Sequence, residues 1–121
     1  MAKLDFIKQL QDLNYTVEQP ATDFLSIEYE IPAGRFTGQK VQMALQVYDS
    51  FPMNPPPGPH FKPLLLPTSG GGGAHPYGAI HASPLGTEWQ YWSRPFNEWN
   101  RSDKTVKTYL AHIRNLFATI P

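Results

Sequence analysis

Apolar positions near the N-terminus recur at a helical spacing. The residues that share this spacing are Leu4, Ile7, Leu10 and Leu13. A three-residue interval lies close to the helical period, so these side chains fall along one stripe. Asn14 is a suitable residue to end the helix. The pattern therefore predicts an amphipathic helix that finishes before Asn14.

In the next part of the chain, apolar residues recur at every second position. Over residues 24–31 and again over residues 41–47, apolar side chains alternate with polar or small ones. This alternation predicts two half-buried strands, and their closeness in the chain favours an antiparallel meander. Short strands over residues 15–19 and 59–62 complete a predicted sheet of four strands.

Proline and glycine dominate the middle of the chain. The sequence has 13 prolines and 9 glycines, most of them between residues 52 and 95. Each proline removes a donor and fixes φ, so residues 52–57 are neither helix nor central strand. Beyond the strand at 59–62 we expect a long loop, which is usually functional or disordered. Because it carries histidine, serine and tryptophan, we favour a functional loop.

The last segment returns to the helical period. Its apolar face consists of Val106, Tyr109, Leu110, Ile113, Leu116, Phe117 and Ile120. This predicts a helix over residues 102–120, with Ser102 or Asp103 as its N-cap. The order of elements predicts an α+β fold. Because the 121 residues contain no internal repeat, we expect one domain over residues 1–121.

Charge and hydropathy narrow the class of protein. Ten basic residues balance ten acidic ones, so there is no net basic field to attract nucleic acid or anionic lipid. No apolar run is long enough to cross a bilayer, and the N-terminus lacks the apolar core of a signal peptide. We expect a cytoplasmic protein that binds neither nucleic acid nor membrane.

The chain has no cysteine, which excludes a disulfide framework, a thiolate zinc site and a thiolate nucleophile. His60, His75 and His81 could supply three metal-binding nitrogens, but they lack a metal-ligand spacing, so no metal site is predicted. The tetraglycine at residues 70–73 is not a phosphate cradle, because no Gly-Lys-Ser/Thr follows it. No cofactor is expected.

A family resemblance rests on the middle of the chain. The segment from Phe51 to Pro56 followed by His60-Phe61 resembles the aromatic-Pro-x-x-Pro-Pro segment of ubiquitin-conjugating enzymes and the strand after it. His75-Pro76-Tyr77 is similar to their His-Pro-Asn motif. Gly78-Ala79-Ile80-His81 falls on their Gly-x-Ile-Cys signature, with His81 in the place of the cysteine. Nearly the whole chain shares the expected order of elements.

The later stretch from Trp89 to Pro95 resembles divergent bacterial relatives, especially the prokaryotic family E type. This resemblance implies a ubiquitin-conjugating fold with a long loop at the active-site position. It also implies an operon, of a phage-defence kind, that encodes a ubiquitin-like protein, an activating-enzyme-like protein and a peptidase. Some such pathways are associated with serine oxyester intermediates. The expected partners are therefore a ubiquitin-like protein and its activating-enzyme-like protein.

Without a thiol, the acyl carrier must be a hydroxyl, which needs a base to take its proton. Ser83 lies two residues after His81, and positions i and i+2 of an extended segment face the same side. We therefore predict Ser83 as the nucleophile and His81 as its base. His75 would orient the imidazole of His81 or stabilise an oxyanion. Backbone N–H groups near Gly78 would also stabilise the oxyanion, because glycine lets a ligand approach closely. Tyr77 would donate a hydrogen bond in place of the missing asparagine.

Each of these residues has a structural alternative. Ser83 precedes Pro84 and is also suited to a turn, while His81 also suits an ordinary loop position. His75 also suits a role in shaping the loop. Ser93 is the rival hydroxyl.

The aromatic and basic residues after the serine have two interpretations each. Trp89, Trp92 and Trp99 are either core caps under a long loop or an aromatic surface for a partner. Arg94 either pairs with the carboxylate of a ubiquitin-like tail or forms a salt bridge with Glu98 or Asp103.

Three functional hypotheses stay open. The first is an acyl transferase that carries a ubiquitin-like protein as a serine oxyester. The second is a binding module of the same fold that has lost its nucleophile. The third is that an alanine, Ala79 or Ala82, stands where a native nucleophile stood.

Overall fold

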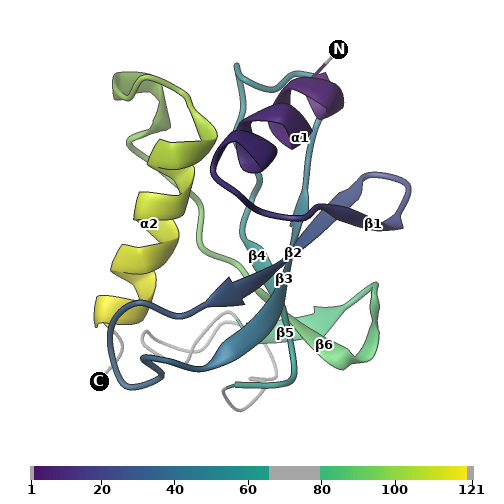
Figure 1. Cartoon of the computed structure of the whole chain (residues 1–121), viewed down its shortest axis with the longest axis vertical. Coiled ribbons are helices and arrows are strands. Elements are labelled where there is room, and N and C mark those ends of the chain that lie inside the picture. The colour runs from purple at the N-terminus through teal and green to yellow at the C-terminus, as the bar shows by residue number, and fades with distance from the viewer. Residues whose placement is uncertain (1, 66–79, 120–121) are drawn as a thin grey trace.

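The computed structural model describes residues 2–65 and 80–119. Within them the chain forms two α-helices, one short 3-10 helix and six strands (Figure 1). The helices are α1 (Ala2–Asp12), η1 (Trp99–Arg101) and α2 (Val106–Thr119). The strands are β1 (Glu18–Ala21), β2 (Phe24–Glu30), β3 (Lys40–Gln46), β4 (Pro59–Lys62), β5 (Ile80–Ser83) and β6 (Gly86–Trp92). The predicted α+β class is confirmed.

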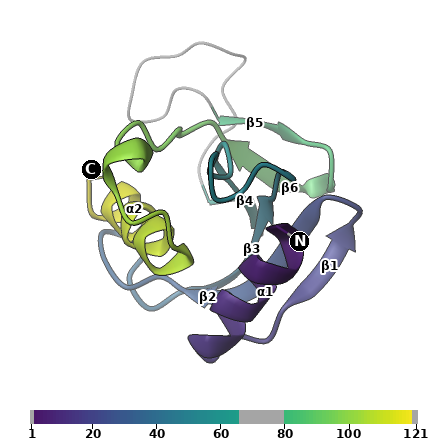
Figure 2. The same cartoon turned by 90° about the horizontal axis from the view of Figure 1, so that it is seen from above.

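The strands form one curled antiparallel sheet in the order β1-β2-β3-β4-β6-β5. Seen from above, the sheet curves around the two helices (Figure 2). The sheet has more than the four strands predicted, because the hairpin of β5 and β6 extends it. Strand β6 pairs with β4, and β5 forms the new edge. Strand 59–62 is therefore not the last strand, and residues 80–92 are not loop.

The hairpin escapes the sequence pattern because a polar residue occupies a core position on β6. Gln90 is fully buried beside Phe61, and its side-chain oxygen accepts hydrogen bonds from the Leu65 N–H (2.9 Å) and the Trp92 indole N–H (3.0 Å). These bonds offset the desolvation of the amide. They also break the alternation that would have identified the strand.

Helix α1 uses a different stripe from the one predicted. Phe6 and Leu10 are its buried residues, whereas Leu4 is 60% exposed and Leu13 is 36% exposed. The predicted stripe was wrong at both ends, because a strict spacing of three drifts off a face that repeats every 3.6 residues. Asn14 has a φ of 74°, a left-handed conformation that ends the helix as predicted.

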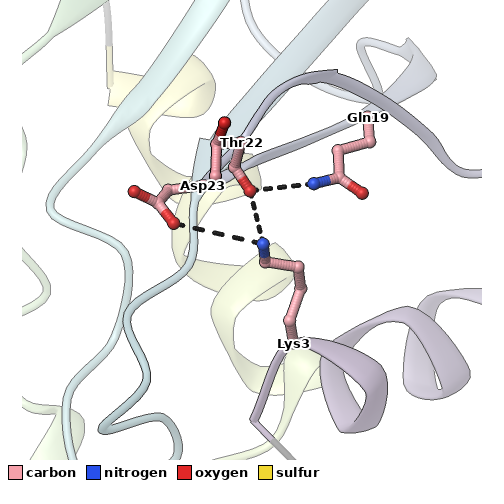
Figure 3. Close-up of polar contacts among 4 residues, drawn as sticks. All are labelled: Lys3, Gln19, Thr22 and Asp23. Atoms are coloured by element: carbon pink, nitrogen blue, oxygen red, sulfur yellow. Dashed lines mark hydrogen bonds and ion pairs between the residues drawn. The ribbon is translucent and has the colours of Figure 1, made fainter.

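The start of α1 is tied to the turn between β1 and β2 (Figure 3). The Lys3 ammonium donates to the Thr22 carbonyl and lies 4.0 Å from the Asp23 carboxylate. Gln19 donates to the same carbonyl at 2.8 Å. Strand β1 begins at Glu18 rather than at residue 15, because its pairing with β2 starts only at Glu18, opposite Ser26.

Helix α2 begins four residues later than predicted. Its first turn is capped by Thr105, whose hydroxyl accepts a hydrogen bond from the Thr108 N–H at 3.2 Å. Asp103 supports the cap by accepting from the Thr105 hydroxyl at 2.9 Å. The Val106 N–H donates to the side chain of Gln9 on α1 at 2.8 Å, so one helix completes the N-terminus of the other.

Aromatic side chains join α2 to the sheet. Phe117 of α2 has its ring centroid 5.3 Å from that of Phe61 on β4 and 5.2 Å from that of Trp92 on β6. Phe61 and Trp92 are themselves 4.8 Å apart and edge-on. This cluster fixes β6 beside β4, and with it the hairpin that carries the candidate serine. None of the helices among the described residues has the length and apolar character to span a bilayer.

Candidate functional site

Ser83 ends β5, and its hydroxyl lies against an imidazole from another strand. Ser83 Oγ is 2.8 Å from Nδ1 of His60, which is on β4. The same oxygen accepts a hydrogen bond from the Leu85 N–H at 3.1 Å, so Ser83 is also the turn residue that its position before Pro84 suggested. When Nδ1 of His60 is the unprotonated ring nitrogen, the Ser83 hydroxyl donates its hydrogen bond to it.

His60 is held in an aromatic setting. Its side chain is 3% exposed, stacks on Tyr91 at 4.6 Å and contacts the ring of Phe24 edge-on at 5.0 Å. Burial penalises the charged form and lowers the pKa of His60 from 6.5 to about 4. The imidazole is therefore neutral near pH 7, and a neutral Nδ1 can accept the proton of Ser83.

The lowered pKa of His60 makes stability depend on pH. In the unfolded chain this group takes up a proton near pH 6.5, but in the folded chain it does so only near 4. The neutral form's contribution is complete above pH 6.5 and is lost as pH falls toward 4, by an amount on the order of 3 kcal/mol. We expect urea denaturation to show this loss in the wild type and a smaller one in His60→Gln. Equal slopes for wild type and His60→Gln would contradict the prediction.

His81 lies in the same cross-strand row as His60. The register pairs His60 with Tyr91 and Tyr91 with His81, and the His81 ring centroid is 6.1 Å from that of Tyr91. His81 is half-buried. A register shift between Ala82 and Ser83 interrupts the simple alternation from which His81 was predicted to reach Ser83. The base role predicted for His81 stays a prediction, while the hydrogen-bonded imidazole beside Ser83 is His60.

Sequence reasoning weighed His60 only as a metal ligand and missed this contact. The two residues are 23 positions apart and lie on strands separated by β6. In the sequence, His60 follows the proline-rich bend and lies on a short predicted strand. This places His60 in the sheet, but it does not identify the residue that its side chain contacts. Three other predicted site residues, His75, Tyr77 and Gly78, lie outside the described residues.

The three tryptophans occupy different environments. Trp92 is 1% exposed and Trp99 is 2% exposed, and the Trp99 indole donates to the Pro52 carbonyl at 2.8 Å. Both pack as core residues. Trp89 is half-buried, with the Lys62 ammonium 5.7 Å from its ring centroid. Of the indoles, Trp89 is therefore the one best placed to meet a partner, and the binding role predicted for Trp92 has no exposed surface to support it.

Arg94 is half-buried, and burial lowers the pKa of its guanidinium. One of its nitrogens donates to the Ser93 carbonyl at 3.1 Å. Of the two acids considered as its salt-bridge partners, Glu98 lies 3.5 Å from Arg101, and Asp103 caps α2. Its predicted contact with a carboxylate tail stays a prediction.

A pocket of about 370 Å³ lies beside Ser83. Its walls come from the hairpin and from one residue after β4: Leu64, Ala82, Ser83, Pro84, Gly86, Thr87 and Trp89. The lining is mostly apolar, with Ser83 and Thr87 as its hydroxyl-bearing residues. Over residues 2–65 and 80–119, no group of three or more His, Cys, Asp or Glu side chains could hold a metal ion.

A family model described as Prokaryotic E2 family E matches residues 6–119. The chain belongs to the prokaryotic E2 family E. The match covers helix α1 from Phe6 onward, every strand of the sheet and all of helix α2. The resemblance to this family is therefore confirmed for nearly the whole chain. Comparison with curated proteins finds no match, and neither does comparison with solved structures. Membership gives this E2-like protein a role related to ubiquitin conjugation, and implies interaction with ubiquitin-like proteins or activating enzymes.

Proposed function

We propose that this E2-like protein carries the C-terminal acyl group of a ubiquitin-like protein as an oxyester on Ser83. It would receive the acyl group from an activating-enzyme-like protein and pass it to a target amine. The observation that supports this most directly is the 2.8 Å contact between the Ser83 hydroxyl and a buried imidazole nitrogen of His60. Serine needs such a partner, because its hydroxyl is a weak nucleophile at neutral pH.

The first half-reaction would run as follows at these atoms. As Ser83 Oγ attacks the activated carbonyl carbon, its proton passes to His60 Nδ1, and a C–Oγ bond forms. The bond between that carbon and the leaving group of the activating protein then breaks, and the leaving group takes the proton from His60. His60 returns to its neutral form, which its buried setting favours. The pocket beside Ser83 would hold the last residues of the tail against Trp89.

Other predicted residues keep supporting roles in this proposal. His75 and Tyr77 would polarise the reacting carbonyl, and backbone N–H groups near Gly78 would stabilise the oxyanion. Arg94 would pair with an acidic group of the partner. These roles rest on the family resemblance and on the chemistry of the residue types.

The experiment is reconstitution of the chain with its activating protein, nucleotide and ubiquitin-like protein, followed by intact mass spectrometry. We expect a one-to-one adduct that survives thiol reductant, is cleaved by hydroxylamine, and maps to Ser83 by peptide sequencing. An adduct that maps to another side chain, or its absence when the activating protein is itself shown to be charged, would overturn the proposal.

A second candidate function is a binding module without acyl chemistry. It is favoured by the hydrogen bond from the Leu85 N–H to Ser83 Oγ, which gives Ser83 a turn-forming role that needs no reaction. Titration with the ubiquitin-like protein separates the two functions. Saturable binding without any covalent adduct under activating conditions would favour the module.

A further inference from the structure

Two imidazoles flank one phenol ring beside the candidate nucleophile. His60, Tyr91 and His81 are direct neighbours across β4, β6 and β5. The Tyr91 ring is 4.6 Å from His60 and 6.1 Å from His81, at interplanar angles of 27° and 30°. Because the three residues are direct partners in the strand register, their side chains lie on one face of the sheet. The Ser83 hydroxyl is hydrogen-bonded to His60, so it lies on the face of the sheet that carries His60. His81 lies on that same face.

The two histidines differ in access. His60 is 3% exposed and its Nδ1 faces Ser83 Oγ, so the proton that it handles is the one exchanged with that oxygen. His81 is half-buried and lies on β5, the outermost strand of the sheet on that side. Of the two imidazoles on the face that carries Ser83, His81 is therefore the one accessible from solvent.

Acyl transfer to an amine has a proton requirement of its own. A lysine amine has a pKa of about 10.4, so at neutral pH it arrives as an ammonium ion without a lone pair. One proton must leave before attack, and a second must leave the nitrogen as the amide forms. His60 can return one proton to Ser83, but the first needs another acceptor.

We propose that His81 is a catalytic base for the second half-reaction, taking a proton from the ammonium group of the acceptor amine. The proposal rests on the function proposed above and extends it to a second, differently placed imidazole. It gives the residue at the cysteine position of the family signature a role distinct from activation of Ser83.

The acceptor R–NH₃⁺ gives one proton to His81, and the resulting amine attacks the carbonyl carbon of the Ser83 ester. The C–Oγ bond breaks, and a second proton passes from the new C–N nitrogen through His60 to Ser83 Oγ. The products are an amide, a free Ser83 hydroxyl, neutral His60 and protonated His81, which releases its proton to water.

Other titratable side chains near this face are less suited to the task. The Lys62 ammonium is already cationic and lies 3.9 Å from Glu88. Glu88 is 78% exposed and engaged with that lysine. Tyr91 faces His81 from β6, and a neutral phenol is a poor proton acceptor. Among them, His81 is the half-buried imidazole, and a ring nitrogen is the usual general base in proteins.

The test separates charging from discharge. The full-length protein is first charged on Ser83, and the purified ester is then mixed with free lysine or with hydroxylamine, which is largely unprotonated at neutral pH. We expect His81→Gln to charge normally but to discharge to lysine about 10²-fold more slowly, while its discharge to hydroxylamine stays as in wild type. Glu88→Gln, on the same hairpin, is the matched control and should match wild type with both amines.

Two results would overturn the inference while leaving the proposed function intact. One is unchanged discharge of His81→Gln to lysine. The other is equal slowing with lysine and hydroxylamine, which would indicate a structural effect on the ester rather than deprotonation of the amine. Failure of the wild type to form any Ser83 ester would instead overturn the proposed function and the inference with it.

Discussion

Ser83→Ala is expected to abolish the ester adduct, and His60→Gln to slow its formation by roughly 10²–10⁴-fold. The first change removes the attacking oxygen. The second removes the proton acceptor that lies 2.8 Å from it and leaves a side chain that cannot take up a proton. Both rates are measured as the initial increase of adduct mass after nucleotide is added.

Two controls make this result specific. Ser93→Ala is the same substitution at the rival hydroxyl, which is half-buried after the end of β6, and it should form the adduct as the wild type does. Because His60 is buried, His60→Gly, which leaves a cavity where the ring was, is also tested with added imidazole, and imidazole should restore part of the rate. A normal adduct in Ser83→Ala, or its loss in Ser93→Ala, would assign the chemistry to a different residue.

Gly58→Ala is expected to destabilise the fold by about 3 kcal/mol and to slow ester formation at the same time. An added Cβ at Gly58 would lie 2.1 Å from the Trp92 carbonyl oxygen and 3.0 Å from the Arg94 nitrogen. Both are backbone atoms, so the contact is relieved only by moving the end of β6 away from β4. That movement would also separate Ser83, on the same hairpin, from His60.

Gly38→Ala is the matched control for this prediction. Gly38 has a φ of +89°, but an added Cβ there meets nothing within 4 Å. The control should therefore lower stability by about 1–2 kcal/mol through backbone strain alone and leave ester formation unchanged. Urea denaturation and the adduct assay are run on both variants. Wild-type stability in Gly58→Ala would show that the close approach of β4 and β6 is not required.

The elements that the sequence predicted well are those with an unbroken period. Strands β2 and β3 were predicted from their alternating residue types, although both faces are buried over residues 24–27 and 43–45. Helix α2 carries an apolar stripe of which Val106, Tyr109, Ile113 and Phe117 are buried. The hairpin β5–β6 was missed because buried Gln90 interrupts its pattern, although the hydrogen bonds to its side chain make it a proper core residue.

The candidate site was also predicted from the sequence only in part. The sequence indicated Ser83 from the family frame and from the need for a hydroxyl, and it placed His81 on an extended segment, where the structure has β5. It could not indicate that the Ser83 hydroxyl would meet the imidazole of His60. Such a contact depends on which strands are neighbours, and the pairing of β6 between β4 and β5 is not local information.

The sequence by itself determined that residues 1–121 carry no thiol, that their fold is α+β, and that they resemble the prokaryotic E2 family E. These follow from residue identity and local periodicity. Only the tertiary structure decided that the hydroxyl of Ser83 meets His60, that His81 stands apart on the outer strand, and that Trp92 lies in the core. Hydrogen bonds and burial join residues that the chain keeps far apart, and strand order is what brings them together.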